Sequence, residues 1–406
     1  MFYKQINNVF LGVVMLTGDG AYIKKINRQY ILNVIFEKSK ISRANLAKVT
    51  GLNKATISVQ VNDLLHDELI YETREEHNAV GRRPIMLSIN ESAAFFLGID
   101  LDYNQILFNI TNLKGDTVKY EKVDLQTDIY EDIVNIVANR IKRYEQEFSH
   151  AKFGLAQTCI AIHGTVSNDE MIHFIPSYQW RDKNLKHDLN TRGIKNIRIE
   201  NNANLAVYAE KVFHYHNSDN IMLLNLASGI GAGIIINGEL HRGFHGYAGE
   251  MGHMIVYPKG KPCRCGNEGC WERYASEPAF FECANRILDR RVDTHSDVKR
   301  LIDKENPQIM TALQSWITDI SIGINNIINL YNPEMIVLNS PILKSYNGSL
   351  EEINKQLTSS VSYFREIVIS GLGAKSAVVG ACAFGIQKFL DLPSLSLSDT
   401  NNSISA

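Results

Sequence analysis

One short run, GEMGHMIVYPKGKPCRCGNEGCWE from Gly249 to Glu272, constrains the fold more than any other part of the chain. It holds three of the six cysteines within eight residues, and a histidine lies ten residues before the first of them. Thiolate and imidazole are the ligands that structural zinc sites use, and four of them leave no open position for a catalytic water. The run therefore predicts a zinc ion that fixes a loop, the alternative being ordinary reduced thiols in a turn. The predicted ligands are His253, Cys263, Cys265 and Cys270.

The same run resembles the signature of the ROK family, which contains sugar kinases and sugar-responsive repressors. That signature reads Glu-x-Gly-His and then Cys-x-Cys-Gly-x-x-Gly-Cys-x-Glu, and this chain matches each position from Glu250 to Glu272. Further motifs extend the resemblance over most of residues 95–390. The resemblance implies an α/β fold with two actin-like (ribonuclease-H-like) lobes, as in the family's sugar kinases, with a structural zinc loop.

The bulk composition is that of a globular protein of two or three domains, with 406 residues, 45% of them hydrophobic and 21% charged. The cysteines outside the zinc run have no regular spacing, which argues against a disulfide scaffold and for a reducing cytoplasm. An apolar stretch at residues 9–16 is too short to span a bilayer, so no membrane association is expected.

The pattern of the chain divides it into four segments. The strands and helices of the body should include three consecutive strands between residues 94 and 125, a helix around residues 129–148, and a long helix with a buried strand in residues 315–340. The expected segments are an extension of unclear status (residues 1–20, because Met15 could equally be the start), a winged helix-turn-helix (21–90), a sugar-binding body (91–391) and a disordered, Ser- and Asn-rich tail (392–406). In the body, lobe 1 is expected at about 91–202 with the C-terminal helix, and lobe 2 at about 203–372.

Residues 21–90 carry eleven Lys and Arg against seven Asp and Glu, so this segment is basic while the whole chain has a net charge of −2. A small basic domain ahead of an acidic body suits contact with phosphates. Ser42 is placed to cap one short helix, Gly51 permits a left-handed turn, and Asn53 is placed to cap a second helix. Two short helices joined by such a turn predict a helix-turn-helix.

In the second of these helices Ile57, Val61 and Leu64 repeat at helical spacing and should face the core. The polar positions between them are left for solvent or DNA. After this helix two strand-like runs flank a polar loop, and Gly81-Arg-Arg-Pro84 resembles the run found here in ROK repressors. Its two arginines either contact DNA or form the hinge to the body, and a winged module without DNA contact is the alternative for the whole domain. The expected DNA-binding residues are Arg43, Asn53, Lys54, Thr56, Ser58, Gln60, Arg82 and Arg83.

Two departures from the kinase pattern argue against phosphoryl transfer. ROK kinases carry a glycine-rich phosphate turn after the first strand, whereas Gly98-Ile-Asp-Leu-Asp102 lacks the inner glycines and adds a carboxylate. The kinases also have an aspartate base in a Glu-Asn-Asp run, and here that position is Asn202. A carboxamide binds a hydroxyl but does not act as a base near neutral pH. The chain is therefore expected not to be an enzyme.

The resemblance implies that the sugar site itself is kept, with His253 using one ring nitrogen for zinc and the other for a hydroxyl. Where the kinases have Pro-Gly, this chain has His163-Gly164, and this pairing with Glu-Asn-Asn is most similar to the xylose-responsive repressors of the family. The implied sugar-binding residues are His163, Gly164, Asn201, Asn202, Glu250, His253 and Glu272.

The resulting expectation is a sugar-responsive transcriptional repressor that binds double-stranded operator DNA as a homodimer or higher homo-oligomer. D-Xylose is the expected effector and should relieve operator binding. Two alternatives stay open: an active ATP-dependent sugar kinase, and a repressor controlled by a protein partner or by another sugar.

Overall fold

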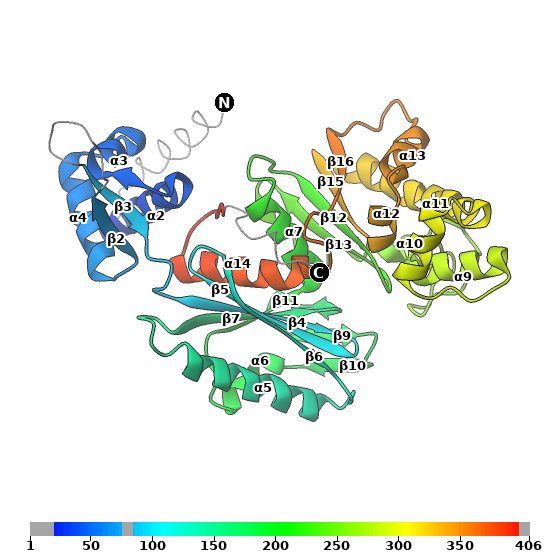
Figure 1. Ribbon diagram of the computed structural model, residues 1–406, viewed down its shortest axis with the longest axis horizontal. Coiled ribbons are helices and arrows are strands. Elements are labelled where there is room, and N and C mark those ends of the chain that lie inside the picture. The colour runs from blue at the N-terminus through cyan, green and yellow to red at the C-terminus, as the bar shows by residue number, and fades with distance from the viewer. Residues whose placement is uncertain (1–19, 75–83, 398–406) are drawn as a thin grey trace.

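The computed structural model describes residues 20–74 and 84–397, which form an N-terminal domain (residues 20–89) and a two-lobed body (Figure 1). In the N-terminal domain three helices pack against a sheet with the strand order β1-β3-β2. Its elements are α2 (Gly20–Lys38), β1 (Ile41–Ser42), α3 (Arg43–Thr50), α4 (Lys54–His66), β2 (Ile70–Arg74) and β3 (Ile85–Ile89).

Local capping residues set the boundaries of α3 and α4, as the sequence predicts. The Ser42 side chain accepts a hydrogen bond from the backbone N–H of Asn45, and Asn53 does the same for Thr56. Gly51 ends α3 with φ of +71°, a conformation in which a side chain would be strained. The three predicted caps and turns are thus confirmed.

The core face of α4 is wider than the sequence pattern indicated. Ile57, Val61 and Leu64 are buried, as predicted. Gln60 was expected to face solvent or DNA, and this is wrong because its side chain is only 3% exposed. It lies three residues after Ile57, and residues three and four apart share one helix face. Among the described residues, its Oε1 atom has no hydrogen-bond partner.

The body contains two five-stranded sheets with the same topology. In each, the first strand is central and forms a hairpin with the second, the third lies at one edge, and the fourth and fifth follow in parallel on the other side. The first sheet has the order β11-β7-β4-β5-β6, with β4 (Phe95–Asp102), β5 (Gln105–Asn112), β6 (Thr117–Asp124), β7 (Leu155–Ile162) and β11 (Ile197–Asn201). The second has the order β14-β13-β12-β15-β16, with β12 (Ile221–Leu226), β13 (Ile230–Ile236), β14 (Glu239–Leu240), β15 (Met335–Asn339) and β16 (Glu366–Ile369).

Helices cover both faces of these sheets (Figure 1). The outer helices of lobe 1 are α5 (Tyr130–Glu147) and α6 (Leu185–Thr191), and a small hairpin sheet of β8 (Thr165–Val166), β9 (Ile172–Ile175) and β10 (Trp180–Lys183) extends this lobe. Lobe 2 carries α8 (Glu272–Ala275), α9 (Glu277–Leu288), α10 (His295–Asp303), α11 (Pro307–Tyr331), α12 (Pro341–Ser345) and α13 (Ser349–Gln356), with the short helices η1 (Met251–His253) and η2 (Gly373–Lys375). The predicted strands and long helices of the body are confirmed, and none of the described helices is long and apolar enough to cross a membrane.

Two topologically equivalent helices, α7 (Asn202–Phe213) and α14 (Ser376–Leu390), lie between the two sheets and pack against each other. α14 also packs on β4 and β7 of lobe 1, whereas α7 packs on β13 and β12 of lobe 2. The helices approach so closely that a Cβ atom added at Gly380 of α14 would lie 1.9 Å from the backbone oxygen of Leu205 in α7. The pair therefore joins the two lobes at their hinge.

The sequence predicts a disordered tail from residue 392, but in the structure the segment after α14 packs against the body as far as residue 397. Leu392, Leu395 and Leu397 are buried, and the N–H of Leu397 donates to the Val212 oxygen over 3.0 Å. The expectation of disorder is therefore wrong for residues 392–397, because three spaced leucines among the serines belong to a buried core cluster of the body. Residues 398–406 lie outside the described part.

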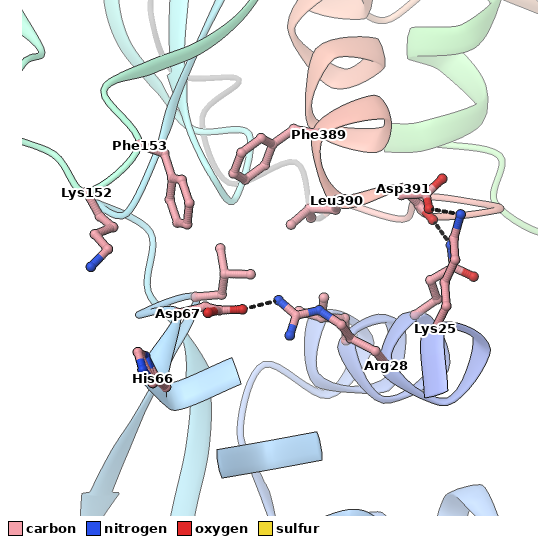
Figure 2. Close-up of a pocket in the computed structure, with 12 residues that line it drawn as sticks. Lys25, Arg28, His66, Asp67, Lys152, Phe153, Phe389, Leu390 and Asp391 are labelled. Carbon is pink, nitrogen blue, oxygen red and sulfur yellow. Dashed lines mark hydrogen bonds and ion pairs between the residues drawn. The ribbon is translucent and has the colours of Figure 1, made fainter. Parts of the chain in front are cut away.

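A cavity of about 650 Å³ separates the N-terminal domain from the C-terminal end of α14 (Figure 2). Side chains of α2 and of the segment after α4 line one side, and Phe389, Leu390 and Asp391 line the other. The joint between the two parts of the molecule is thus only partly filled by side chains.

Candidate metal and sugar site

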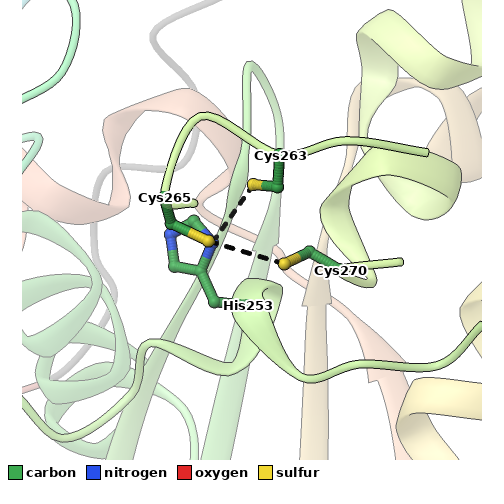
Figure 3. Close-up of side chains that lie close together, drawn as sticks. All are labelled: His253, Cys263, Cys265 and Cys270. Atoms are coloured by element: carbon green, nitrogen blue, oxygen red, sulfur yellow. Dashed lines mark hydrogen bonds between the residues drawn. The ribbon is translucent and has the colours of Figure 1, made fainter. Parts of the chain in front are cut away.

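The four predicted zinc ligands converge on one point at the loop between η1 and α8 (Figure 3). One ligand atom of each lies within 4.8 Å of the others. The Sγ atoms of Cys265 and Cys270 are 3.6 Å apart, and Cys263 Sγ is 3.7 Å from His253 Nδ1. Tetrahedral zinc with bonds of about 2.3 Å to sulfur places its ligands about 3.8 Å apart. The donor atoms therefore fit a zinc ion.

The three thiols of the cluster differ in their exposure to solvent. Cys270 and Cys263 are buried, whereas Cys265 lies at the surface. Burial raises the pKa of the Cys263 thiol to about 12. Zinc binds the thiolate, so a bound cation would hold this residue in the form that burial alone disfavours.

The two ring nitrogens of His253 face different groups. Nδ1 points to Cys263, whereas Nε2 lies 3.9 Å from Glu250 Oε2. The His253 ring thus lies between the cysteine cluster and Glu250, a residue that the family resemblance predicts to bind the sugar. Glu272 sits on the metal side, since its Oε1 accepts a hydrogen bond from Cys263 Sγ over 3.2 Å and lies 3.7 Å from His253 Nδ1.

His163 forms the centre of a second group of predicted residues, at the end of β7. Its Nε2 atom is 2.7 Å from Asp100 Oδ1, and its Nδ1 atom is 3.6 Å from Asp102 Oδ1. Burial alone would lower the pKa of His163, but the charge of Asp100, its hydrogen bond and the charge of Asp102 together raise that pKa to about 9. His163 is therefore an imidazolium cation near neutral pH.

The charge of His163 decides how Asn202 is oriented. The Asn202 amide lies 3.3 Å from His163 Nδ1, and both nitrogens of an imidazolium donate hydrogen bonds. The structure places the Asn202 Nδ2 atom there, and amide oxygens and nitrogens are assigned from such networks; a protonated His163 favours the opposite orientation, with the Asn202 oxygen towards it. Its NH₂ group is then left to donate to a ligand hydroxyl.

Asn201 has a structural role next to His163 and Asn202. Its Oδ1 accepts the backbone N–H groups of Ala203 and Asn204 and so caps α7, and its Nδ2 donates to the Gly164 oxygen over 2.9 Å. These bonds fix the start of α7 to the turn that carries His163 and Gly164. Asn201 is thus mainly a positioning residue for its neighbours.

The two groups of predicted sugar-binding residues come from different lobes. His163, Gly164, Asn201 and Asn202 come from the C-terminal ends of parallel strands in lobe 1, and Glu250, His253 and Glu272 come from lobe 2. A side-chain hydrogen bond between Thr165 and Glu250 joins them. Clefts at the carboxyl ends of parallel strands are common ligand sites. The seven predicted sugar-binding residues therefore form two groups, one on each lobe, and Thr165 next to Gly164 links the first group to Glu250 of the second.

Sequence reasoning missed two residues of this site, Asp100 and Thr165. Asp100 is buried within a strand that is otherwise largely apolar, and a buried carboxylate needs a charged partner. That anomaly was a signal for its contact with His163. Thr165 carried no comparable signal, because only the tertiary structure brings Glu250 to it.

Apart from the buried Gln60, the predicted DNA-binding residues fall into three groups. Asn53, Lys54 and Ser58 are exposed on α4 or at its start, and Thr56 is half-buried. Arg43 is held within the domain, because its Nη2 donates to Asn62 Oδ1 over 3.0 Å and to Glu72 Oε1 over 2.9 Å. Arg82 and Arg83 lie outside the described residues.

Because the pKa of His163 is raised, the free energy of unfolding should decrease as the pH becomes alkaline. Because the folded pKa lies above the ordinary value of about 6.5, the stabilisation is complete below about pH 6.5 and is lost as pH rises through about 9. We expect the free energy of unfolding by urea to fall more between pH 7 and 10 in the wild type than in His163→Gln. Replacement of His187, an exposed histidine of α6, serves as control. Parallel pH profiles of wild type and His163→Gln would contradict the ion pair.

The two five-stranded sheets have the same topology, and the candidate site residues come from both lobes. This architecture defines a two-lobed protein of the actin-like class. The ROK family model matches residues 96–388, so the chain belongs to the ROK family. A xylose repressor of Bacillus subtilis (strain 168) is 34% identical over 379 residues, which cover 92% of this chain and 98% of that protein.

Solved structures agree with this assignment. The crystal structure of a ROK family transcriptional regulator, a homolog of the E. coli MLC protein, superposes with a TM-score of 0.78 at 26% identity and covers 91% of this chain and 96% of that chain. A ROK family glucokinase from Streptomyces griseus in complex with glucose and AMPPNP superposes with a TM-score of 0.62 at 24% identity, over 71% of this chain and 98% of that chain. The regulator thus matches a larger share of this chain than the kinase does.

Proposed function

We propose that this protein is a sugar-responsive transcriptional repressor with D-xylose as its effector. The observation that carries the proposal is Asn202 beside His163, because a carboxamide at this position offers hydrogen bonds to a hydroxyl but does not itself act as a base. The similarity to a xylose repressor over nearly the whole chain supports the same effector.

The turn after β4 further supports a role without phosphoryl transfer. Asp102 Oδ1 accepts the backbone N–H of Tyr103 over 2.7 Å, and Asn104 completes a tight hairpin with φ of +66°. A phosphate would need that N–H group and would meet the Asp102 charge. An active kinase remains the alternative, and transfer of phosphate from ATP to a sugar by the pure protein would establish it.

The N-terminal domain is the proposed DNA-binding unit, a winged helix-turn-helix with α4 as recognition helix. Lys54 and Ser58 are exposed on α4 and are the proposed contacts, together with Arg82 and Arg83. Arg43 is less available than Lys54 and Ser58, because Glu72 already binds its guanidinium. Operator binding by a homodimer or higher oligomer should weaken steeply with salt.

The proposed zinc ion has a structural role, with His253 as its link to the sugar. By holding Nδ1, zinc would fix the ring so that Nε2 faces the ligand near Glu250. Sugar bound between the lobes would favour one arrangement of the lobes, and α14 would carry this change towards the N-terminal domain. Such coupling requires that sugar binds the two arrangements with different affinity.

Fluorescence anisotropy on DNA from upstream of the protein's own gene tests the proposal. We expect tight binding in low salt that D-xylose releases and that glucose and N-acetylglucosamine do not. Asn202→Ala should bind the DNA equally well but need about 10-fold to 100-fold more xylose, since it loses hydrogen bonds worth roughly 1–3 kcal/mol. Absence of DNA binding would contradict the repressor, and binding that no sugar releases would favour control by a protein partner or another ligand.

A further inference from the structure

The outward face of α4 carries other residues than those that the sequence pattern selected for DNA contact. The core side of this helix holds four buried residues, which are Ile57, Gln60, Val61 and Leu64. Because an α-helix has about 3.6 residues per turn, positions 55, 59 and 62 lie opposite these buried residues. They hold Ala55, Val59 and Asn62, and all three are exposed.

The described residues leave this face of α4 open. The helix packs against α2, α3 and β2, which all belong to the N-terminal domain. The cavity at the joint with the body is lined by His66, the last residue of α4. Val59 lies two turns before His66 and is 53% exposed, although a valine side chain gains free energy when it leaves water. The surface around Val59 is therefore accessible to a partner.

The surroundings of Val59 suit double-stranded DNA. Lys48 in the last turn of α3 and Lys54 at the start of α4 are exposed, and neither forms an ion pair with a described carboxylate. In a helix-turn-helix the second helix enters the major groove, where its N-terminal residues contact base edges. Cations beside the groove bind phosphates. Val59 is in the second turn of α4, so it is placed for a base edge.

The chemistry of this face selects among the bases. An asparagine recognises adenine through its amide oxygen and nitrogen together. The Asn62 Oδ1 atom instead accepts a hydrogen bond from Arg43 Nη2 over 3.0 Å, so the amide is directed at α3. Val59 and Ala55 present only methyl groups. In the major groove, thymine is the base that carries a methyl group, and apolar side chains contact it there.

We propose that Val59 recognises the methyl group of a thymine in the operator, with Ala55 one turn earlier allowing the helix to approach the bases closely. This inference rests on the proposed DNA binding and adds the base that is recognised. Lys48, Lys54 and Ser58 bind the DNA backbone, which positions the helix at any sequence. Val59 supplies selectivity, because a thymine methyl group leaves water together with the valine, whereas cytosine leaves a gap in that place.

DNA without thymine methyl groups tests this role of Val59. DNA from upstream of the protein's own gene is prepared once with thymidine and once with deoxyuridine, which pairs in the same way but lacks the C5 methyl group. Fluorescence anisotropy in low salt measures both affinities. Burial of one methyl group is worth about 4-fold in affinity, so a dimer with one such contact in each half-site should prefer the thymidine DNA by about 10-fold or more.

The variant Val59→Ala identifies the residue that senses the methyl group. Alanine is the better helix former, so the variant should keep its fold. Its preference for thymidine over deoxyuridine should fall to about 3-fold or less, because most of the contact is removed. The slope of log Kd against log salt should stay unchanged, whereas Lys54→Gln should reduce that slope by about one.

Val118→Ala is the matched control, because Val118 is a similarly exposed valine on β6 of the body. This variant should bind both DNAs as the wild type does. Equal binding of the two DNAs by the wild type, or a wild-type preference for thymidine in Val59→Ala, would overturn the role of Val59 and leave the repressor intact. Failure of the wild type to bind either DNA in low salt would contradict the proposed repressor and this role together.

Discussion

Replacing Cys265 by serine is expected to remove the zinc ion, destabilise the protein and abolish its response to xylose together. Serine is a poor zinc ligand, and the remaining residues of the cluster would leave the shell incomplete. Loss of a structural metal is among the largest effects of one substitution, so we expect a loss of about 3 kcal/mol or more in the free energy of unfolding. Metal content by mass spectrometry, thermal unfolding and xylose release of DNA measure the three effects.

The matched control is Cys283→Ser. Cys283 is half-buried on α9 and lies outside the cluster, so this variant should keep its zinc and its response. A Cys265→Ser protein that is folded, responsive and still carries one zinc per chain would disprove the metal site. A variant that loses zinc but still releases DNA with xylose would instead show that the metal is not needed to orient His253 for the sugar.

Features that depend on neighbours in the sequence could be predicted. The predicted metal ligands Cys263, Cys265 and Cys270 lie in one short loop, so their spacing alone indicates a common site. The caps at Ser42 and Asn53 are equally local, because each side chain bonds a backbone N–H three residues ahead. In both cases the interacting residues are close in the sequence, so the interaction can be predicted without the tertiary structure.

Features that depend on tertiary packing could not be predicted in the same way. Gln60 is an exception, because its spacing of three residues from Ile57 already places it on the core face of α4. The serine-rich composition, by contrast, hid the three leucines that pack after α14. The Asp100 contact joins residues 63 positions apart, which no local pattern shows. The cavity at the domain joint is lined by residues far apart in the chain, such as Phe153 and Phe389, so no local pattern shows it.

Replacing Gly380 by alanine is expected to disrupt the joint between the lobes. The new Cβ atom would lie 1.9 Å from the Leu205 backbone oxygen, and neither helix backbone can give way without moving the other. Overpacking of a core costs about 1–3 kcal/mol and more where backbone must shift, so we expect a loss of at least about 3 kcal/mol. Equilibrium unfolding in urea measures this loss.

Gly385, five residues further along the same helix, provides a control with the opposite sign. A Cβ atom there would lie 3.4 Å from the Gln157 side chain, which is an ordinary contact. Alanine is favoured over glycine in a helix by roughly 0.5–1 kcal/mol, so Gly385→Ala should stabilise the protein by about that amount. Equal effects of the two substitutions would mean that α7 and α14 are not packed this closely in solution.

The same pair of variants tests how the sugar site is connected to the joint. α7 begins at Asn202, so a displacement of α7 by Gly380→Ala should move that residue away from His163. The variant is therefore expected to need much more xylose for DNA release, in conditions where it is still folded, while Gly385→Ala responds as the wild type does. If Gly380→Ala stays folded with an unchanged xylose response, the close packing of α7 and α14 does not position the sugar site.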